Sequence, residues 1–249
     1  MSVRTQEKSL KVLAMIFEAR YDEGYRFLDR TGELLISIRR AKPSWVVAGI
    51  TQKFVSLIHR EQNLQLNIGV EKIDISTNKQ MALAESEKQS RILGEAAEEF
   101  YSLTTEVLKI PRATRVGTRF AFLAPSDNLE EADRFMWKAA ASPLINAVAE
   151  ETKSQPREAQ LVYVLDDPNS GFRRRVTLSS VVLEQKPEDP PYLGLPGDPG
   201  SGGIVVDIDT FMRPEETQVG KISIFTQDNF LKSRSQAINI LGWLVRQQK

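Results

Sequence analysis

The sequence of 249 residues predicts an α+β fold, built from two β-α-β-β(-α) halves whose mainly antiparallel sheet packs against helices. Two observations lead to this prediction. Segments in which apolar side chains alternate with period two recur along the chain, and segments with apolar spacings of three and four separate them. Their order is strand, helix, two strands, helix, and then strand, helix, three strands, helix. The halves are residues 1–110 and 111–249, which could also form one continuous domain.

The first half begins with a strand that is apolar on both faces, which is typical of a strand in the middle of a sheet. Its expected elements are a strand at 10–19, a helix at 25–40, a hairpin with strands at 54–59 and 64–75, and a helix at 80–108. A hairpin that turns at Thr31 and Gly32 is the alternative to the first helix, because glycine weakens a helix interior. Pro111 ends the second helix.

The second half repeats this order and adds a strand. Its expected elements are a strand at 115–123, a helix kinked at Ser142 and Pro143 that runs to 149, strands at 159–165, 172–183 and 202–211, and a helix at 228–245. Asp127 and Glu130 have the spacing of a capping box for the first of these helices. Thr226 is the expected N-cap of the last one.

Composition excludes several classes of function. Lys plus Arg equals Asp plus Glu at 33 each, so no net charge attracts the protein to nucleic acid or to an anionic membrane. The absence of cysteine excludes disulfides, thiolate metal sites and cysteine nucleophiles. His59 is the only histidine, which makes a catalytic triad or a histidine metal centre improbable. The sequence shows no signal peptide or apolar span, so we expect a cytoplasmic protein without membrane contact and without a cofactor.

The acid pair Asp207 and Asp209 is the one feature of a well-defined element that could support chemistry, but it does not identify a reaction. Alternation places both on one face of the strand at 202–211, about 7 Å apart, while Ile204, Val206 and Ile208 face the core. Paired carboxylates are weak candidates for a Mg²⁺ or Mn²⁺ site. The alternative, which we favour, is a structural ionic network in which these acids pair with arginines on a neighbouring strand, Arg115 and Arg119.

Two motifs resemble those of a known family. Arg115-Val116-Gly117-Thr118-Arg119 follows a long helix, and the Asp-x-Asp strand of Asp207 and Asp209 precedes a C-terminal helix. The chain therefore resembles a sporadically distributed, uncharacterised bacterial protein family of similar length. That family has Leu and Tyr where this chain has Thr118 and Phe120. The resemblance supports the fold and implies no activity, catalytic residue or cofactor.

Two further segments have a structural and a functional interpretation. Arg173, Arg174 and Arg175 follow a turn that contains two aspartates, which favours a salt-bridged hairpin over a phosphate-binding site. Residues 187–203 form a long loop rich in proline and glycine, with three apolar side chains at its centre, Tyr192, Leu193 and Leu195. Long loops within compact domains are usually functional or disordered, so simple mobility is the structural interpretation. The functional interpretation, on which our prediction rests, is that these three residues bind another protein chain.

Three classes of function remain. We favour a non-catalytic protein-interaction component of a bacterial cytoplasmic multi-protein system, whose partner is another protein chain or a second copy of this one. The first alternative is a small-ligand-binding module that uses a cavity between sheet and helices. The second is a metal-dependent phosphoesterase or nuclease built on Asp207 and Asp209, against which the lack of a third acid in a recognisable motif argues.

Overall fold

One antiparallel sheet contains all the strands of the described chain. The computed structural model describes residues 9–22, 25–77, 79–110, 113–126, 129–140, 143–153, 160–167, 171–182, 202–212 and 221–246. The strands are β1 (Lys11–Arg20), β2 (Val46–Ile50), β3 (Phe54–His59), β4 (Leu64–Gly69), β5 (Lys72–Thr77), β6 (Met81–Ala82), β7 (Arg115–Ser126), β8 (Gln160–Asp167), β9 (Phe172–Val182) and β10 (Gly202–Met212). The helices are α2 (Arg26–Ala41), α3 (Leu83–Leu108), α4 (Leu129–Ala140), α5 (Pro143–Thr152) and α6 (Ile222–Arg246). The predicted α+β class is confirmed.

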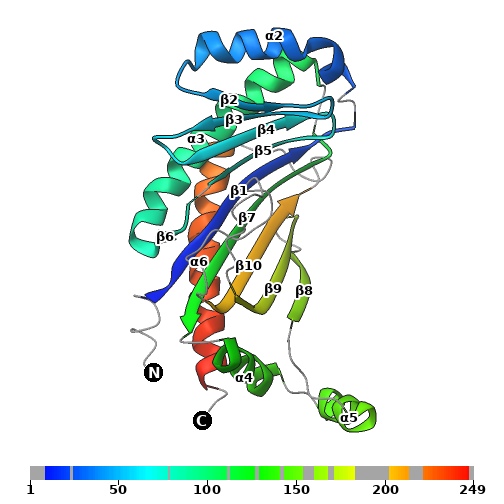
Figure 1. Ribbon diagram of the computed structural model, residues 1–249, viewed down its shortest axis with the longest axis vertical. Coiled ribbons are helices and arrows are strands. Elements are labelled where there is room, and N and C mark those ends of the chain that lie inside the picture. The colour runs from blue at the N-terminus through cyan, green and yellow to red at the C-terminus, as the bar shows by residue number, and fades with distance from the viewer. Residues whose placement is uncertain are drawn as a thin grey trace.

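The sheet has the same order of strands on both sides of its centre. Its strands are hydrogen-bonded in the order β2-β3-β4-β5-β1-β7-β10-β9-β8, and β6 pairs with one end of β1. Each half starts with its central strand, β1 or β7, continues through one or more helices to the outer edge, and returns strand by strand to the centre. A long helix, α3 or α6, then closes the half (Figure 1). The predicted proximity of the strands at 115–123 and 202–211 is confirmed, because β7 and β10 are neighbours.

The main core lies between the sheet and the two long helices. α3 and α6 pack against one face of the sheet and against each other (Figure 1). The strand positions expected to face the core do so: Ile204, Val206 and Ile208 of β10 are all buried in this cluster. Phe230 of α6 contacts the rings of Phe120 and Phe122 on β7, with the first pair of rings edge to face at 5.4 Å. Apolar burial on this scale supplies the main driving force for folding.

The other face of the sheet, which we call the second face, differs along its length. Near one end it carries a small buried apolar cluster of Leu13, Ala121, Leu123 and Val205. Along the same strands, alternation then brings charged side chains to this face, such as Arg119 and Asp207. A single sheet therefore separates an apolar core on one side from a largely ionic surface on the other.

The first half contains more strands than the sequence predicted. The helix expected at 25–40 is present as α2, and the alternative hairpin at Thr31 and Gly32 is wrong. The single strand expected at 64–75 is in fact two strands, β4 and β5, because the chain turns at Val70 and Glu71. At this turn the Val70 N–H donates to the Lys53 carbonyl, and the backbone carbonyl of Glu71 accepts from the Tyr21 N–H. β2 was not predicted at all. The sequence predicted more strands in the second half than in the first, whereas the structure has more strands in the first half.

The two long helices begin at other residues than expected. α3 starts at Leu83 because Met81 and Ala82 pair with β1. α6 starts at Ile222, so Thr226 lies inside the helix and is buried; its assignment as the N-cap was wrong. The carboxylate of Glu98 on α3 accepts hydrogen bonds from the backbone N–H of Ser223, at 3.1 Å, and from the Ser223 hydroxyl. A tertiary contact thus satisfies a free donor of the first turn. Asp127 of the predicted capping box lies outside the described residues.

Gly117 of β7 lies where the second face has no room for a side chain. A Cβ atom at this position would come within 2.8 Å of the Phe211 Cβ and 2.9 Å of the Thr210 carbonyl oxygen on β10. Phe211 is directly opposite Gly117 in the register, and the Arg115 guanidinium lies 4.2 Å from the centre of the Phe211 ring. Gly117 therefore admits the aromatic ring on which Arg115 stacks.

Replacing Gly117 with alanine should lower the free energy of unfolding by about 1–3 kcal/mol, the usual cost of forcing atoms into a close-packed region. Gly32 of α2 is the matched control, because nothing lies within 4 Å of its added Cβ. Gly32→Ala should stabilise the protein by about 0.5–1 kcal/mol through better helix propensity. Urea unfolding measures both values, and equal effects at the two positions would contradict this account of Gly117.

Candidate functional site

Asp207 and Asp209 of β10 pair with two arginines of β7. The Arg119 guanidinium donates from Nε, at 2.9 Å to each carboxylate oxygen of Asp207, and from Nη2 to Oδ2 at 2.6 Å. Arg115 Nη2 donates to Asp209 Oδ2 at 2.7 Å. The structure thus contains the ionic network expected for these four residues. Each acid is held by an arginine of the neighbouring strand.

Glu18 of β1 extends this network across the centre of the sheet. Its carboxylate lies 2.7 Å from Arg20 Nε, 2.9 Å from Lys72 Nζ and 3.5 Å from Arg115 Nη1. Arg20 is directly opposite Lys72 on one side and Arg115 on the other. Three cations therefore form one row across β5, β1 and β7, and they share one carboxylate. We call Lys72, Arg20 and Arg115 the cationic row.

Buried amides continue the network toward β4. Asp74 of β5 accepts from Lys72 Nζ at 3.0 Å and from Asn67 Nδ2 at 2.8 Å. Gln65 Nε2 donates to the side-chain oxygen of Asn67 at 3.3 Å and to the Ser56 hydroxyl at 3.1 Å. These polar residues are buried, and polar groups in such positions need partners. The hydrogen bonds and ion pairs run from β3 to β10.

The pKa values of the Glu18 and Asp209 carboxyl groups are shifted in opposite directions. Burial would raise the pKa of Glu18, but hydrogen bonds from Arg20 and Lys72 outweigh it and hold the pKa below its ordinary value of 4.5. Burial raises the pKa of Asp209 above 3.8, because the opposing attraction of Arg115 is offset by the negative charges of Asp207 and Glu18. Of these two acids, Asp209 is the one whose negative charge is less stabilised.

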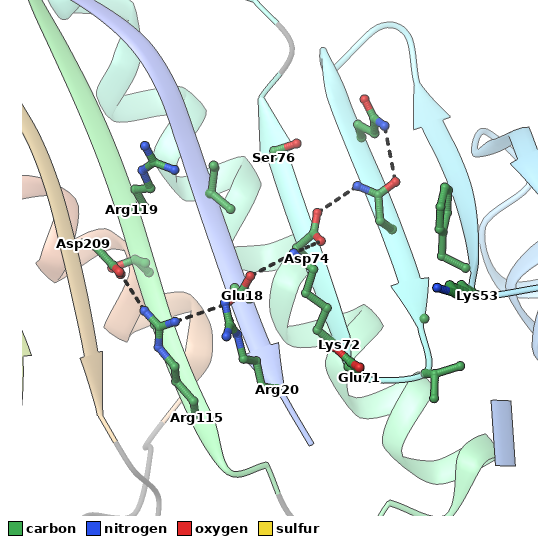
Figure 2. A pocket seen from close by; sticks show the side chains of 18 residues that line it. Glu18, Arg20, Lys53, Glu71, Lys72, Asp74, Ser76, Arg115, Arg119 and Asp209 are labelled. Atoms are coloured by element: carbon green, nitrogen blue, oxygen red, sulfur yellow. Dashed lines mark hydrogen bonds and ion pairs between the residues drawn. The ribbon is translucent and has the colours of Figure 1, made fainter. Parts of the chain in front are cut away.

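A hollow of about 760 Å³ opens over this network (Figure 2). Its lining comes from β1, β4, β5, β7 and β10 and from the residues around Lys53 and Phe54 at the start of β3. Figure 2 shows Arg115 between Glu18 and Asp209, with Arg20, Lys72 and Asp74 beside them. The hollow lies on the second face, so it is not the cavity between sheet and helices that the sequence suggested for a ligand-binding module.

The edge strand β8 is a second candidate site. Val162, Tyr163, Val164 and Leu165 are 44–64 % exposed, and together they expose apolar side chains on both faces of the strand. Beside it lies a groove of about 580 Å³, lined mainly by apolar residues that include Leu161, Leu165 and the half-exposed Trp243 of α6. Among the described strands, β8 pairs only with β9. Its outer backbone groups therefore face no described strand.

The remaining residues that the sequence singled out have different outcomes. Tyr192, Leu193 and Leu195 lie outside the described residues, so the loop interface stays a prediction. His59 is buried, contacts the Trp45 ring edge to face at 5.5 Å, and accepts at Nδ1 from the Gln62 N–H. Arg173 donates to Asp166 at 3.0 Å, and Arg174 lies 3.8 Å from Asp167, which matches the expected salt-bridged hairpin. The cationic row and β8 were not predicted as sites.

The described ranges contain neither a cluster of metal ligands nor a membrane-spanning helix. Within them, no three or more His, Asp or Glu side chains come close enough together to hold a metal ion. None of the helices in these ranges is both long and apolar enough to cross a membrane. The carboxylates of Asp207 and Asp209 are oriented by Arg119 and Arg115.

Comparison with known proteins does not assign the chain to a family. No protein-family model matches it, and neither does any curated protein. The resemblance to an uncharacterised bacterial family, which rests on the strand motifs around Arg115 and Asp207, stays a prediction.

If Asp207 is structural, Asp207→Asn should lower the free energy of unfolding by about 1 kcal/mol, since its partner Arg119 is partly exposed to solvent. Adding Mg²⁺ or Mn²⁺ should leave the melting temperature of the wild-type protein unchanged. Calorimetry with and without each metal measures both effects. A metal-dependent rise in melting temperature that disappears in the variant would favour the metal-site interpretation instead.

The pH dependence of stability should differ in sign between Glu18→Gln and Asp209→Asn. Glu18→Gln should cost about 1–3 kcal/mol at neutral pH, because the variant loses hydrogen bonds to charged donors. Since the pKa of Glu18 is lowered, the wild type loses this advantage as the pH falls from 4.5 through the folded-state pKa.

The pKa of Asp209 is raised in the folded state, so that state takes up the proton first. The wild type should therefore gain stability relative to Asp209→Asn as the pH falls through the raised pKa toward 3.8. Urea unfolding of the three proteins between neutral pH and about pH 3 tests both trends. Two differences that change in the same direction would show that the network has been misread.

Proposed function

We propose that this chain is a non-catalytic protein-interaction component that binds an extended segment of another protein chain along β8. The observation that carries the proposal is the position of this strand. A run of apolar residues on both faces is typical of a strand whose two faces are covered. β8 has that composition but lies at the end of the sheet. An added strand would pair its outer backbone groups and cover its apolar side chains.

The opposite edge of the sheet shows how such a strand is normally protected. β2 also exposes valine and isoleucine side chains, but its register shifts between Val47 and Gly49, and irregular edges of this kind disfavour further pairing. β8 pairs with β9 without a shift, from Gln160 opposite Ser179 to Asp167 opposite Phe172. It contains no lysine, proline or bulge. A regular apolar edge that no described strand covers supports a role in binding.

The charges of β8 define the chemistry of its partner. Its only ionisable carboxylates, Asp166 and Asp167, lie at the C-terminal end, and Asp166 is 69 % exposed despite its contact with Arg173. In antiparallel pairing, which the rest of this sheet uses, these acids would face the beginning of the added strand. The partner segment should therefore carry a basic residue near its start, followed by alternating apolar residues that fill the groove beside Trp243.

The environment of the acids on the second face supports a non-catalytic function. Asp207 and Asp209, the candidates for metal-dependent hydrolysis, are each bound by an arginine. Arg119 engages both oxygens of Asp207 and Arg115 engages one oxygen of Asp209, so neither acid keeps its full carboxylate for a metal. The proposal leaves the loop residues Tyr192, Leu193 and Leu195 as a separate predicted contact.

Val164→Glu tests the proposal, because a carboxylate on the exposed edge should block an added apolar strand. Val164 is directly opposite Arg175, an exposed cation on β9 with which the new carboxylate can pair, so the variant should fold normally. Proteins captured by the wild-type chain from extracts of its own organism should be purified and added back. The complex should protect the amides of residues 160–167 from hydrogen exchange, and Val164→Glu should bind at least about tenfold more weakly.

Val46→Glu, the same substitution at the opposite edge, is the matched control and should bind normally. A second copy of this chain as the partner would appear as a dimer that Val164→Glu converts to a monomer. Binding that survives Val164→Glu, or protection confined to other segments, would refute the proposal.

A further inference from the structure

The lining of the hollow on the second face exposes its cations more than its anions. Five basic side chains line it, and four of them are exposed; of the four lining acids, only Glu71 is. The same difference appears within individual pairs. Arg20 is 51 % exposed and its partner Glu18 20 %, and Lys72 is 46 % exposed and its partner Asp74 11 %. The groups that solvent or a ligand meets first in this hollow are therefore mostly N–H donors.

The cationic row adds a second argument. Like charges directly opposite each other on neighbouring strands repel, and here three cations lie side by side. Lys72 also contacts Asp74, and Arg115 also contacts Asp209, whereas Arg20, in the middle, forms its one ion pair within the described ranges with Glu18. Glu18 is shared among all three. The row thus has its fewest direct ion-pair contacts at Arg20.

Several donors around the hollow remain available. Arg20 uses only Nε for Glu18, so its two terminal amino groups donate to no described residue. Arg119 uses Nε and Nη2 for Asp207 and keeps Nη1. The ammonium group of Lys53 has no partner among the described residues. Two arginines and a lysine from three different strands or strand ends therefore present free donors to one hollow.

From these observations we infer that the hollow binds an extended organic anion with several acidic groups, whose carboxylate or phosphate oxygens accept hydrogen bonds from Arg20, Arg119 and Lys53 at separate points. Guanidinium groups suit both kinds of oxyanion because their paired N–H groups match two oxygens. The acids beneath the cations hold them in place through ion pairs, as Glu18 does for Arg20. Phe54 and Ile16 give the hollow apolar lining for the rest of the ligand. This inference is independent of β8 and of the proposed protein partner.

Arg20→Gln and Lys53→Gln test the inference with a linear phosphate, tripolyphosphate, and citrate as probes. Binding is measured by calorimetric titration and by the rise in melting temperature, each at an ionic strength held constant with sodium chloride. At least one probe should bind saturably to the wild type, and each variant should weaken that binding about tenfold, the effect expected for losing a hydrogen bond to a charged group. Binding of tripolyphosphate alone would assign the site to phosphate compounds, and of citrate alone to carboxylates.

Two matched controls carry the same charge change away from the hollow, Arg39→Gln on α2 and Lys232→Gln on α6, both at exposed positions. They should bind the probes like the wild type. In the described part of the chain Lys53 has no ion-pair partner, and Glu18 keeps Lys72 and Arg115 when Arg20 is replaced. Both test variants should therefore fold, which their melting curves will show. The inference is wrong if neither probe stabilises the wild type more than sodium chloride does, or if the test variants bind as tightly as the controls.

Discussion

The pairing of β1 with β7 is the constraint on which the rest of the structure depends. These two strands are the first of their respective halves, and their hydrogen bonds join both halves into one sheet. On one side they carry the aromatic and aliphatic residues that α3 and α6 cover. On the other they bring Glu18 and Arg20 of β1 beside Arg115 and Arg119 of β7. A shift of this pairing by one residue would turn apolar side chains toward the second face and charges into the core.

The ionic network reinforces that register at a cost. Charges that are half removed from water lose hydration, and ion pairs return this free energy only where the geometry is good. The bidentate contact of Arg119 with Asp207 and the three contacts of Glu18 have such geometry. Apart from the contact of Glu18 with Arg20 within β1, these contacts join neighbouring strands, so a misaligned sheet would leave most of these charges without their partners. The charges of the second face therefore favour one alignment of the strands over its alternatives.

Local patterns in the sequence predicted much of the fold, and tertiary contacts explain most of what they missed. Alternation identified the strands around Arg115 and Asp207, and opposite charges on them indicated their pairing. No local signal shows that Glu98 caps α6, because this contact joins residues 125 positions apart in the chain. The cationic row was equally hidden, since Lys72, Arg20 and Arg115 become neighbours only in the assembled sheet. The apolar run of β8 reads as an interior strand, and only the sheet order places it at an edge.

The mirrored order of strands has a consequence for how the chain could be divided. The boundary between the halves lies between α3 and β7, and few elements other than the central strands and the two long helices connect them. A polypeptide containing either half alone would expose the full hydrogen-bonding edge of β1 or β7 and the side of one long helix. Such a fragment would bind the missing half, or in its absence another fragment like itself. Because both halves belong to one chain, their association is intramolecular and takes place at a high effective concentration.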